Sequence, residues 1–190
     1  MNSNFIKPIA AFIIIVTTSM TFEFVDDKVI KEPEVVAKVV DPTQLACMAK
    51  NIFYEAGNES IKGQAAVARV VINRVNHGFA KTPCAVVYQS NVVEKIVDDE
   101  MVNVKLCQFS WDCEGKGEPN INSTRYKQAH QVAYEVMAND AYSEVVPKSA
   151  LFFHNLQVDP LWPYKQVAKI GNHIFYSKHK KPEKTNTQKI

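Results

Sequence analysis

Apolar residues recur at helical spacing in the stretch that follows Asp41-Pro42. Six of them fall on one stripe of a helix, namely Leu45, Met48, Ala49, Ile52, Phe53 and Ala56. Asp41 is suited to cap this helix, and proline is suited to its first turn. At 100° per residue, Glu55 lies about 80° from Leu45, at the border of the stripe. Cys47 falls on the outward face, where a thiol is better suited to tether another segment than to pack in the core.

Three further helices follow from the same kind of pattern. One is predicted from about Lys62 to Val75, a short one begins at Thr82-Pro83, and another is capped by Ser123 or Thr124. After residue 148 the pattern changes, because residues 149–155 ("SALFFHN") are rich in strand formers. Two short strands are predicted around the two-residue turn Gly171-Asn172. Helices followed by a small C-terminal sheet predict an α+β fold.

The first 25 residues have a different character. Lys7 precedes an uncharged, mostly apolar run that ends at Glu23. A basic residue before a short apolar core is typical of a secretory signal. Residues 5–25 nearly reach the length of a membrane span, so a retained anchor is the second interpretation and a buried core helix the third.

The rest of the chain divides into three parts. Residues 26–42 alternate charges with valines and are predicted to be a linker, followed by one domain over residues 43–176. Residues 177–190 carry five lysines and are expected to form a disordered basic tail, or one with weak attraction to a polyanionic surface.

Composition narrows the classes of partner and cofactor. With 190 residues, a net charge of +2 and a pI of about 8.3, the chain is too weakly basic to indicate a nucleic-acid partner. The four cysteines (Cys47, Cys84, Cys107 and Cys113) predict two disulfides in one of three pairings, or a zinc site. No C-x-x-C pair is present, so we expect neither a metal nor another cofactor. Separately, we expect the protein to be a monomer.

Glu55 and Glu59 are the first candidates for chemistry. Paired carboxylates suit acid–base work on a glycosidic bond, where the acid needs apolar surroundings that raise its pKa. Phe53 and Tyr54 could supply such surroundings for Glu55. Spacing alone, however, is more typical of a solvated pair at a helix end.

A second candidate is the segment 107–113 ("CQFSWDC"). A loop closed by its two cysteines would present Gln108, Ser110 and Trp111, which suit the binding of a sugar. The alternative is that Phe109 and Trp111 plug the core beneath the loop. Among the histidines, His154 is the one best placed to line a cleft.

These motifs, taken in order, resemble a known family. The residues Glu55-Ala56, Glu59, Gly63-Gln64 and Asn73-Arg74-Val75 are similar to the opening of the SleB-type (spore cortex-lytic enzyme-like) cell-wall hydrolases of bacteria and phages. "CQFSW", "LFFHN" and "VAKIGNHIFY" continue the resemblance to residue 176, and "CQFSW" is typical of its Gram-negative and phage branch. Ser60 stands where the family often has proline.

The resemblance implies a peptidoglycan-cleaving glycosidase, either a muramidase or a lytic transglycosylase. It implies a mainly helical, lysozyme-like domain and one catalytic glutamate, Glu55, which cuts the MurNAc–GlcNAc bond. A non-catalytic peptidoglycan-binding module is the alternative. Substrate contacts are expected at Glu59, Gln64, Gln108, Ser110, Trp111 and His154. By analogy, Cys47 pairs with Cys84 and Cys107 with Cys113, and the protein acts in the periplasm, exported or anchored, in a bacterium or in phage lysis.

Overall fold

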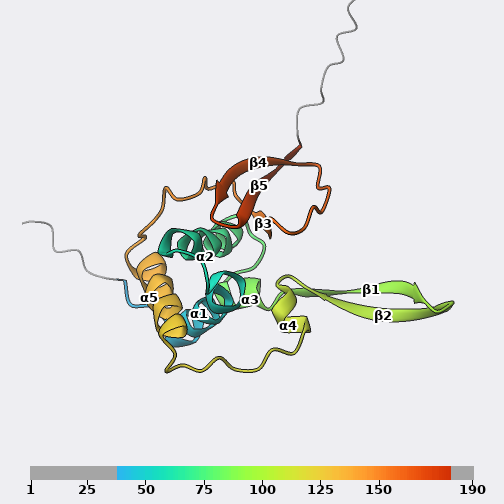
Figure 1. Ribbon diagram of the computed structural model, residues 1–190, viewed down its shortest axis with the longest axis horizontal. Coiled ribbons are helices and arrows are strands. Elements are labelled where there is room, and N and C mark those ends of the chain that lie inside the picture. Colours follow the sequence, from blue (N-terminus) through green and yellow to red (C-terminus); the bar gives the residue numbers. More distant parts are fainter. Residues whose placement is uncertain (1–37, 181–190) are drawn as a thin grey trace, which may run out of the picture. The chain divides into compact units, whose positions relative to one another are not determined.

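The computed structural model describes residues 38–180 (Figure 1). The predicted export segment 1–25, most of the predicted linker and the tail from residue 181 lie outside the described residues. Within residues 38–180, no helix combines the length and the apolar character needed to cross a membrane.

The first helix forms as its pattern predicts. Helix α1 spans Pro42–Ala56, and the Asp41 carboxylate accepts hydrogen bonds from the backbone amides of its first turn, at 2.7 Å from Thr43 N. The apolar stripe is buried, while Glu55, at its border, is only partly exposed. The helix therefore carries Glu55 to its last turn, at the edge of the core.

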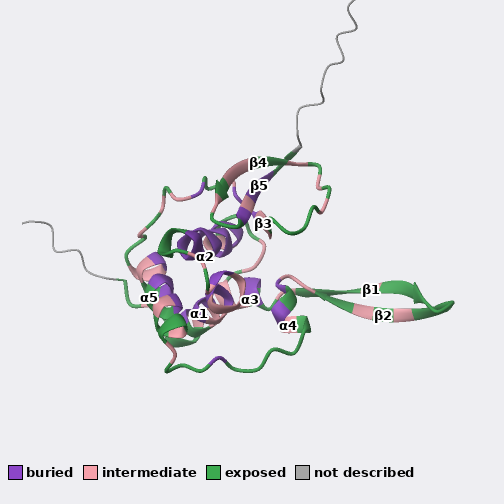
Figure 2. Ribbon diagram, in the orientation of Figure 1, coloured by how far each residue is buried: buried purple, intermediate pink, exposed green. Residues whose placement is uncertain are grey.

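Helix α2 (Ile61–Asn76) is the centre of the helical part. Ser60 caps it by accepting a hydrogen bond from Gly63 N, so serine suits this position as the residue that starts the helix. Nearly every residue from Gly63 to Arg74 is buried, as Figure 2 shows by colour. Such burial is typical of a helix enclosed by other elements rather than lying on the surface.

The other helices surround this pair. They are α3 (Pro83–Val87), α4 (Ser110–Cys113) and α5 (Thr124–Ala138), which Ser123 caps. The main core cluster joins α1, α2, α3 and α5 with the α4 segment, and its largest side chains are Trp111, Phe109, Met48, Ile52 and Leu45. Helices α1, α2, α3 and α5 confirm the four predicted helices, whereas α4 lies in the segment that was expected to form a loop.

Two antiparallel sheets complete the domain. Strands β3 (Phe152–Asn155), β4 (Tyr164–Ile170) and β5 (His173–Lys180) form a sheet in the order β3-β5-β4. Gly171, at a φ of 55°, and Asn172 make the predicted turn between β4 and β5. The α+β fold class is therefore confirmed.

The C-terminal sheet extends beyond residue 176, the predicted end of the domain. Strand β5 continues to Lys180, and Ser177 is buried and pairs with Lys165, so the first residues of the predicted basic tail belong to the sheet. Pairing between β5 and β4 continues to Lys180, although the apolar pattern of the sequence ends before it.

The second sheet is a hairpin for which the sequence analysis predicted no element. Strands β1 (Ser90–Val97) and β2 (Glu100–Cys107) pair along their full length and extend away from the helices in Figure 1. Asp98 and Asp99 form its turn with φ values of 51° and 63°. Both values are positive, as a two-residue hairpin turn requires.

Two disulfides tie these elements together. Cys47 of α1 is bonded to Cys84 of α3, and Cys107 at the end of β2 is bonded to Cys113 of α4. This pairing is the one that the resemblance implied. The second bond closes the loop that carries Phe109 and Trp111 into the core.

Candidate active site

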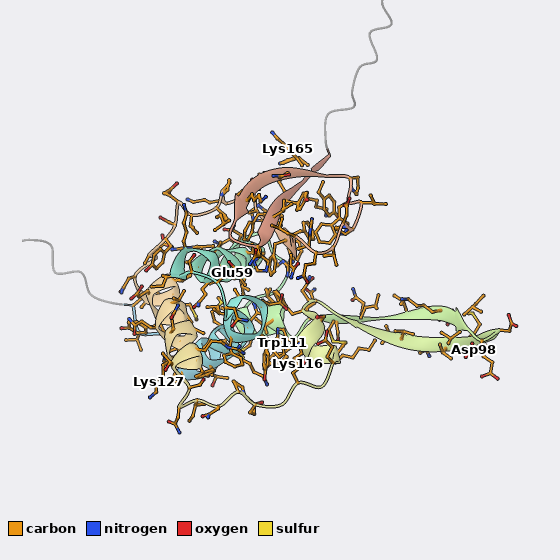
Figure 3. All side chains as sticks on the ribbon, in the orientation of Figure 1. Glu59, Asp98, Trp111, Lys116, Lys127 and Lys165 are labelled. Atoms are coloured by element: carbon orange, nitrogen blue, oxygen red, sulfur yellow. A yellow bond between two sulfur atoms is a disulfide. The ribbon has the colours of Figure 1, made fainter. Side chains whose placement is uncertain are left out.

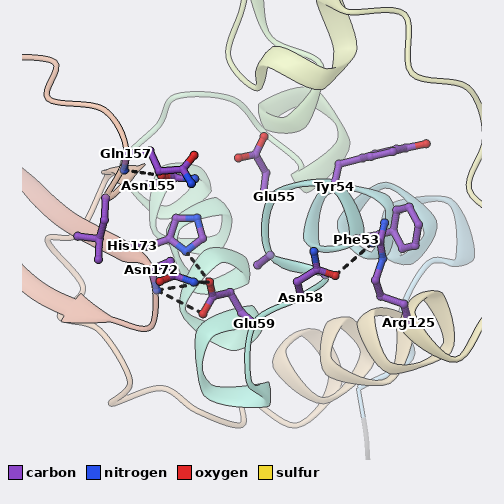
Figure 4. Close-up of a pocket in the computed structure, with 13 residues that line it drawn as sticks. Phe53, Tyr54, Glu55, Asn58, Glu59, Arg125, Asn155, Gln157, Asn172 and His173 are labelled. Atoms are coloured by element: carbon purple, nitrogen blue, oxygen red, sulfur yellow. Dashed lines mark hydrogen bonds and ion pairs between the residues drawn. The ribbon is translucent and has the colours of Figure 1, made fainter.

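A cavity of about 300 Å³ opens at the C-terminal end of α1 (Figure 4). One side is formed by residues 53–59 and by Arg125 of α5. The other side is formed by the end of β3 and by the turn between β4 and β5, through Asn155, Leu156, Gln157, Asn172 and His173. The cavity thus lies where the helical part meets the C-terminal sheet.

Glu55 lines this cavity from the last turn of α1. Burial raises the pKa of its carboxyl group to about 7, and the nearby Glu114 carboxylate also raises it, whereas the charges of Lys116 and Arg74 lower it. Among the described residues 38–180, no hydrogen bond contributes to the pKa of this carboxyl, and none of the dashed interactions in Figure 4 reaches it. A carboxyl group that is desolvated and without donors keeps its proton to neutral pH.

Arg74 supplies buried positive charge near Glu55. Its Nε donates to the Leu151 carbonyl at 2.7 Å, and its guanidinium lies 5.2 Å from the centre of the Phe109 ring. Burial lowers the pKa of Arg74 to about 10, although the charge of Glu55 raises it. The sequence analysis cited Arg74 only as part of a family motif, although a charged residue within a buried helix marks it as a candidate.

The loop that follows α4 also supplies charges near Glu55, through Glu114 and Lys116. Lys116 Nζ is 2.9 Å from Glu114 Oε2, and Tyr54 donates a hydrogen bond to the Gly117 carbonyl at 2.5 Å. Lys116 and the buried Trp111 come from this one short segment around α4 (Figure 3). The loop is thereby held next to the residue that precedes Glu55.

Glu59 also lines the cavity, but it is bound to the β4–β5 turn. Its carboxylate accepts from Asn172 Nδ2 at 3.0 Å and from Asn172 N at 3.4 Å, and it lies 3.9 Å from His173 Nδ1. A side chain at position 171 would clash with it, since a Cβ added to Gly171 would lie 1.9 Å from Glu59 Oε2. Only 11% of the Glu59 side chain is exposed, so it acts as a tether between the α1–α2 loop and the C-terminal sheet.

We expect Glu59→Ala to loosen this turn. The Asn172 amide loses its acceptor, so its hydrogen exchange should speed up about tenfold or more, and the free energy of unfolding should fall by about 1–2 kcal/mol. Exchange measured by NMR tests this, with Glu59→Gln, which keeps one acceptor oxygen, as the milder control. Unchanged exchange at Asn172 would show that the tether does not hold the turn.

Two of the other residues expected to bind substrate are structural. Trp111 is 2% exposed, stacks on Tyr54 with ring centres 5.1 Å apart, and donates through Nε1 to Asn51 Oδ1 at 3.1 Å. Its ring is therefore enclosed in the core, which agrees with the second of the two interpretations that the sequence left open. Gln64 is also buried, and its Nε2 donates to the Glu59 carbonyl at 3.1 Å, which supports the loop from within.

Three more expected contacts do not line the cavity. Gln108, with its amide oxygen turned toward Arg74, accepts from both terminal nitrogens at 3.1 and 3.2 Å. His154 stacks on Tyr176 and bonds to its hydroxyl through Nε2 at 2.8 Å. Ser110 is exposed at the start of α4 and interacts with the Glu114 side chain. The structure thus brings only Glu55 and Glu59 of the predicted set to the cavity.

The cavity contains other residues that the sequence analysis did not select. They are Asn58, Arg125, Asn155, Leu156, Gln157, Asn172 and His173. Asn155 ends the motif "LFFHN", and Asn172 and His173 lie within "VAKIGNHIFY", so membership of these motifs was their sequence signal. In the described part of the chain, no three side chains of His, Cys, Asp or Glu gather as a metal site would require.

Comparison with known proteins points to one family. The sequence model of the family described as "Cell Wall Hydrolase" matches residues 58–176. A similar solved structure is the catalytic domain of the Bacillus cereus SleB protein, which has 22% sequence identity and a TM-score of 0.49, with 77% of this chain and 99% of that chain covered. No curated protein matches the chain.

Proposed function

Because this chain belongs to the cell wall hydrolase family, we propose that it cleaves the MurNAc–GlcNAc bond of peptidoglycan with Glu55 as its acid and base. One observation carries the proposal. Glu55 is a carboxyl group on a cavity wall whose pKa burial raises to about 7. A general acid works best when its pKa lies near the working pH.

The proposed reaction begins with neutral Glu55. It donates its proton to the glycosidic oxygen, and the bond between that oxygen and C1 of the muramoyl residue breaks. The resulting Glu55 carboxylate then takes the proton of the muramoyl O6 hydroxyl as O6 attacks C1, which closes a 1,6-anhydro ring. Each proton that Glu55 gives is thereby recovered in the same cycle.

The surroundings of the other carboxylates favour this route over the usual two-carboxylate mechanism. Glu59 is engaged by Asn172, and Glu114 is paired with Lys116, so neither is free to act as a nucleophile. The two-carboxylate glycosidases need a second, free carboxylate near the scissile bond. In simple hydrolysis, a water molecule would replace O6 as the attacking group.

Product masses test the proposal. The purified protein is incubated with sacculi and the soluble muropeptides are analysed by mass spectrometry. Fragments lighter by one water than reducing muropeptides are expected for the anhydro route, whereas reducing ends would identify a muramidase. Retention on sacculi with no soluble fragments would identify a peptidoglycan-binding module instead, and would contradict the proposed activity.

The pH dependence provides a further prediction. Since the acid form of Glu55 is the active one, kcat/KM should fall as the pH rises through about 7, by about tenfold per pH unit above it. Lys116 lowers the pKa of Glu55, so in Lys116→Gln the fall of kcat/KM (the alkaline limb of the pH profile) should move to higher pH. In Glu114→Gln this limb should move to lower pH. Initial rates on soluble glycan strands between pH 5 and 9 would show this.

Lys127→Gln is the matched control for charge. Lys127 is an exposed lysine on α5 that is not among the cavity residues, so its removal should leave the limb in place. A limb near the ordinary glutamate pKa of about 4.3 would contradict the assigned role of Glu55.

The same proposal includes a site of action outside the cytoplasm. Peptidoglycan lies there, and the two disulfides are typical of an oxidising compartment. We therefore propose export to the periplasm, with residues 1–25 as a cleaved signal or an anchor, in a bacterium or in phage lysis.

A further inference from the structure

Arg125 is held in place at the mouth of the cavity. Its guanidinium carbon lies 4.0 Å from the centre of the Phe53 ring, and its Nη1 donates to Asn58 Oδ1 at 3.2 Å. Figure 4 shows Arg125 reaching from α5 toward Phe53 and Asn58. Stacking on a ring and one hydrogen bond restrict the side chain before any ligand arrives.

A close approach of the backbone allows this placement. A Cβ added to Gly57 would lie 3.0 Å from Arg125 Nε, so any larger residue at that position would press against the arginine. Arg125 can therefore lie across the end of α1, two residues beyond Glu55.

The charge of Arg125 is not neutralised within the described residues. The acidic groups that line the cavity are Glu55, which burial keeps largely protonated up to about pH 7, and Glu59, which is bound to Asn172. Neither of them, nor any other carboxylate in residues 38–180, lies within 4.0 Å of the Arg125 nitrogens. The two cations that act on Glu55 already have partners, since Lys116 is paired with Glu114 and Arg74 is bonded to the Leu151 carbonyl.

We propose that Arg125 binds a carboxylate on the muramoyl substituent of the glycan strand. This inference rests on the proposed function. The sugar rings of peptidoglycan are uncharged. Its carboxylates belong to the peptide stem, because the lactyl carboxyl group is bound to that stem as an amide. A guanidinium with free N–H donors matches a carboxylate in charge and geometry. Arg125 would therefore orient the muramoyl residue beside Glu55 and distinguish this glycan from one without acidic substituents.

The test combines a change in the protein with a change in the substrate. Wild type, Arg125→Gln and Lys127→Gln are assayed on soluble stem-bearing glycan strands and on the same strands with their carboxyl groups converted to amides. On native strands, Arg125→Gln should lower kcat/KM by about tenfold, mainly through KM. Amidation should lower the wild-type value by a similar factor and leave the Arg125→Gln value nearly unchanged. Lys127→Gln should behave like the wild type on both.

A third substrate identifies the source of the carboxylate. An amidase removes the stem with its carboxylates and frees the lactyl carboxylate, which stem-bearing strands hold as an amide. A difference between wild type and Arg125→Gln that disappears on these strands assigns the contact to the stem, and one that persists shows that Arg125 also accepts a carboxylate at the lactyl position.

Two results would overturn the inference. One is an unchanged kcat/KM for Arg125→Gln on native strands, and the other is an equal loss on amidation in wild type and Arg125→Gln. Failure of the proposed function is a different result, because the wild type would then release no fragments from any of the strands.

Discussion

Glu55→Gln is expected to lower kcat/KM on peptidoglycan strands by about a thousandfold or more. Glutamine keeps the size and polarity of the side chain but has no proton to donate to the leaving oxygen. General acid–base catalysis by one positioned group contributes about 10²–10⁴ in rate. In the proposed reaction Glu55 acts both as the acid and as the base, so its loss removes both contributions. Release of soluble muropeptides, followed over time, measures the loss.

The same substitution should make the protein more stable at neutral and higher pH. In the folded state Glu55 keeps its proton up to about pH 7, whereas in the unfolded chain it ionises near 4.5. The folded state therefore binds more protons between these values, and stability falls as the pH rises through this window. At pH 8 the cost is about 2–3 kcal/mol, which glutamine removes, whereas at pH 4 both states hold the proton and no gain is expected.

Thermal unfolding of both proteins at pH 4 and pH 8 separates these effects. Glu94→Gln is the control for loss of a carboxylate, because Glu94 is an exposed residue of β1. It should change neither activity nor the pH dependence of stability. Wild-type turnover by Glu55→Gln would end the assignment of Glu55, and a lower stability at pH 8 would show that its burial does not raise its pKa.

Trp111→Ala should have the largest effect on stability, a loss of about 3–5 kcal/mol. The indole is enclosed in the core, stacks on Tyr54 and has Lys50 Nζ at 5.4 Å from its ring. Its removal leaves a cavity and takes the donor from Asn51, which is itself fully buried. Chemical denaturation of wild type and variant gives the difference.

Trp111→Phe distinguishes a core role from sugar binding. Phenylalanine fills much of the space, so it should recover part of the stability and leave KM on glycan strands unchanged. A large rise in KM with little loss of stability would instead support the original interpretation of Trp111 as a sugar platform.

Much of the helical part could be predicted because its signals are local. The cap at Asp41, the proline that follows it and the apolar stripe of α1 lie within one run of fifteen residues or next to it, and each acts on its neighbours. The turn at Gly171-Asn172 is equally local. The same signals placed Glu55 at the border of the stripe, where the structure leaves it partly exposed.

The β1–β2 hairpin was missed because its local signal is weak. Its turn residues, Asp98 and Asp99, both adopt positive φ without a glycine or asparagine between the strands. Many of its apolar side chains remain exposed, including Val92, Ile96 and Met101. Neither strand therefore has a buried apolar face opposite a polar one, which is the arrangement that marks a half-buried strand in a sequence. Pairing between the two strands, rather than a buried face, defines this element.

The sequence by itself determined helices α1, α2, α3 and α5, the C-terminal turn and the position of Glu55 at the end of α1. Only the tertiary structure decided which side chains share the cavity. Glu59 bonds to Asn172 across 113 residues, and Arg74 bonds to Gln108. Trp111 is buried in the core, and Arg125 stacks on Phe53 with no carboxylate of residues 38–180 within 4.0 Å. The physical reason is that helix and turn propensities act over a few residues, whereas desolvation and pairing depend on every segment that packs around a group. The pKa of Glu55 belongs to that second kind of property.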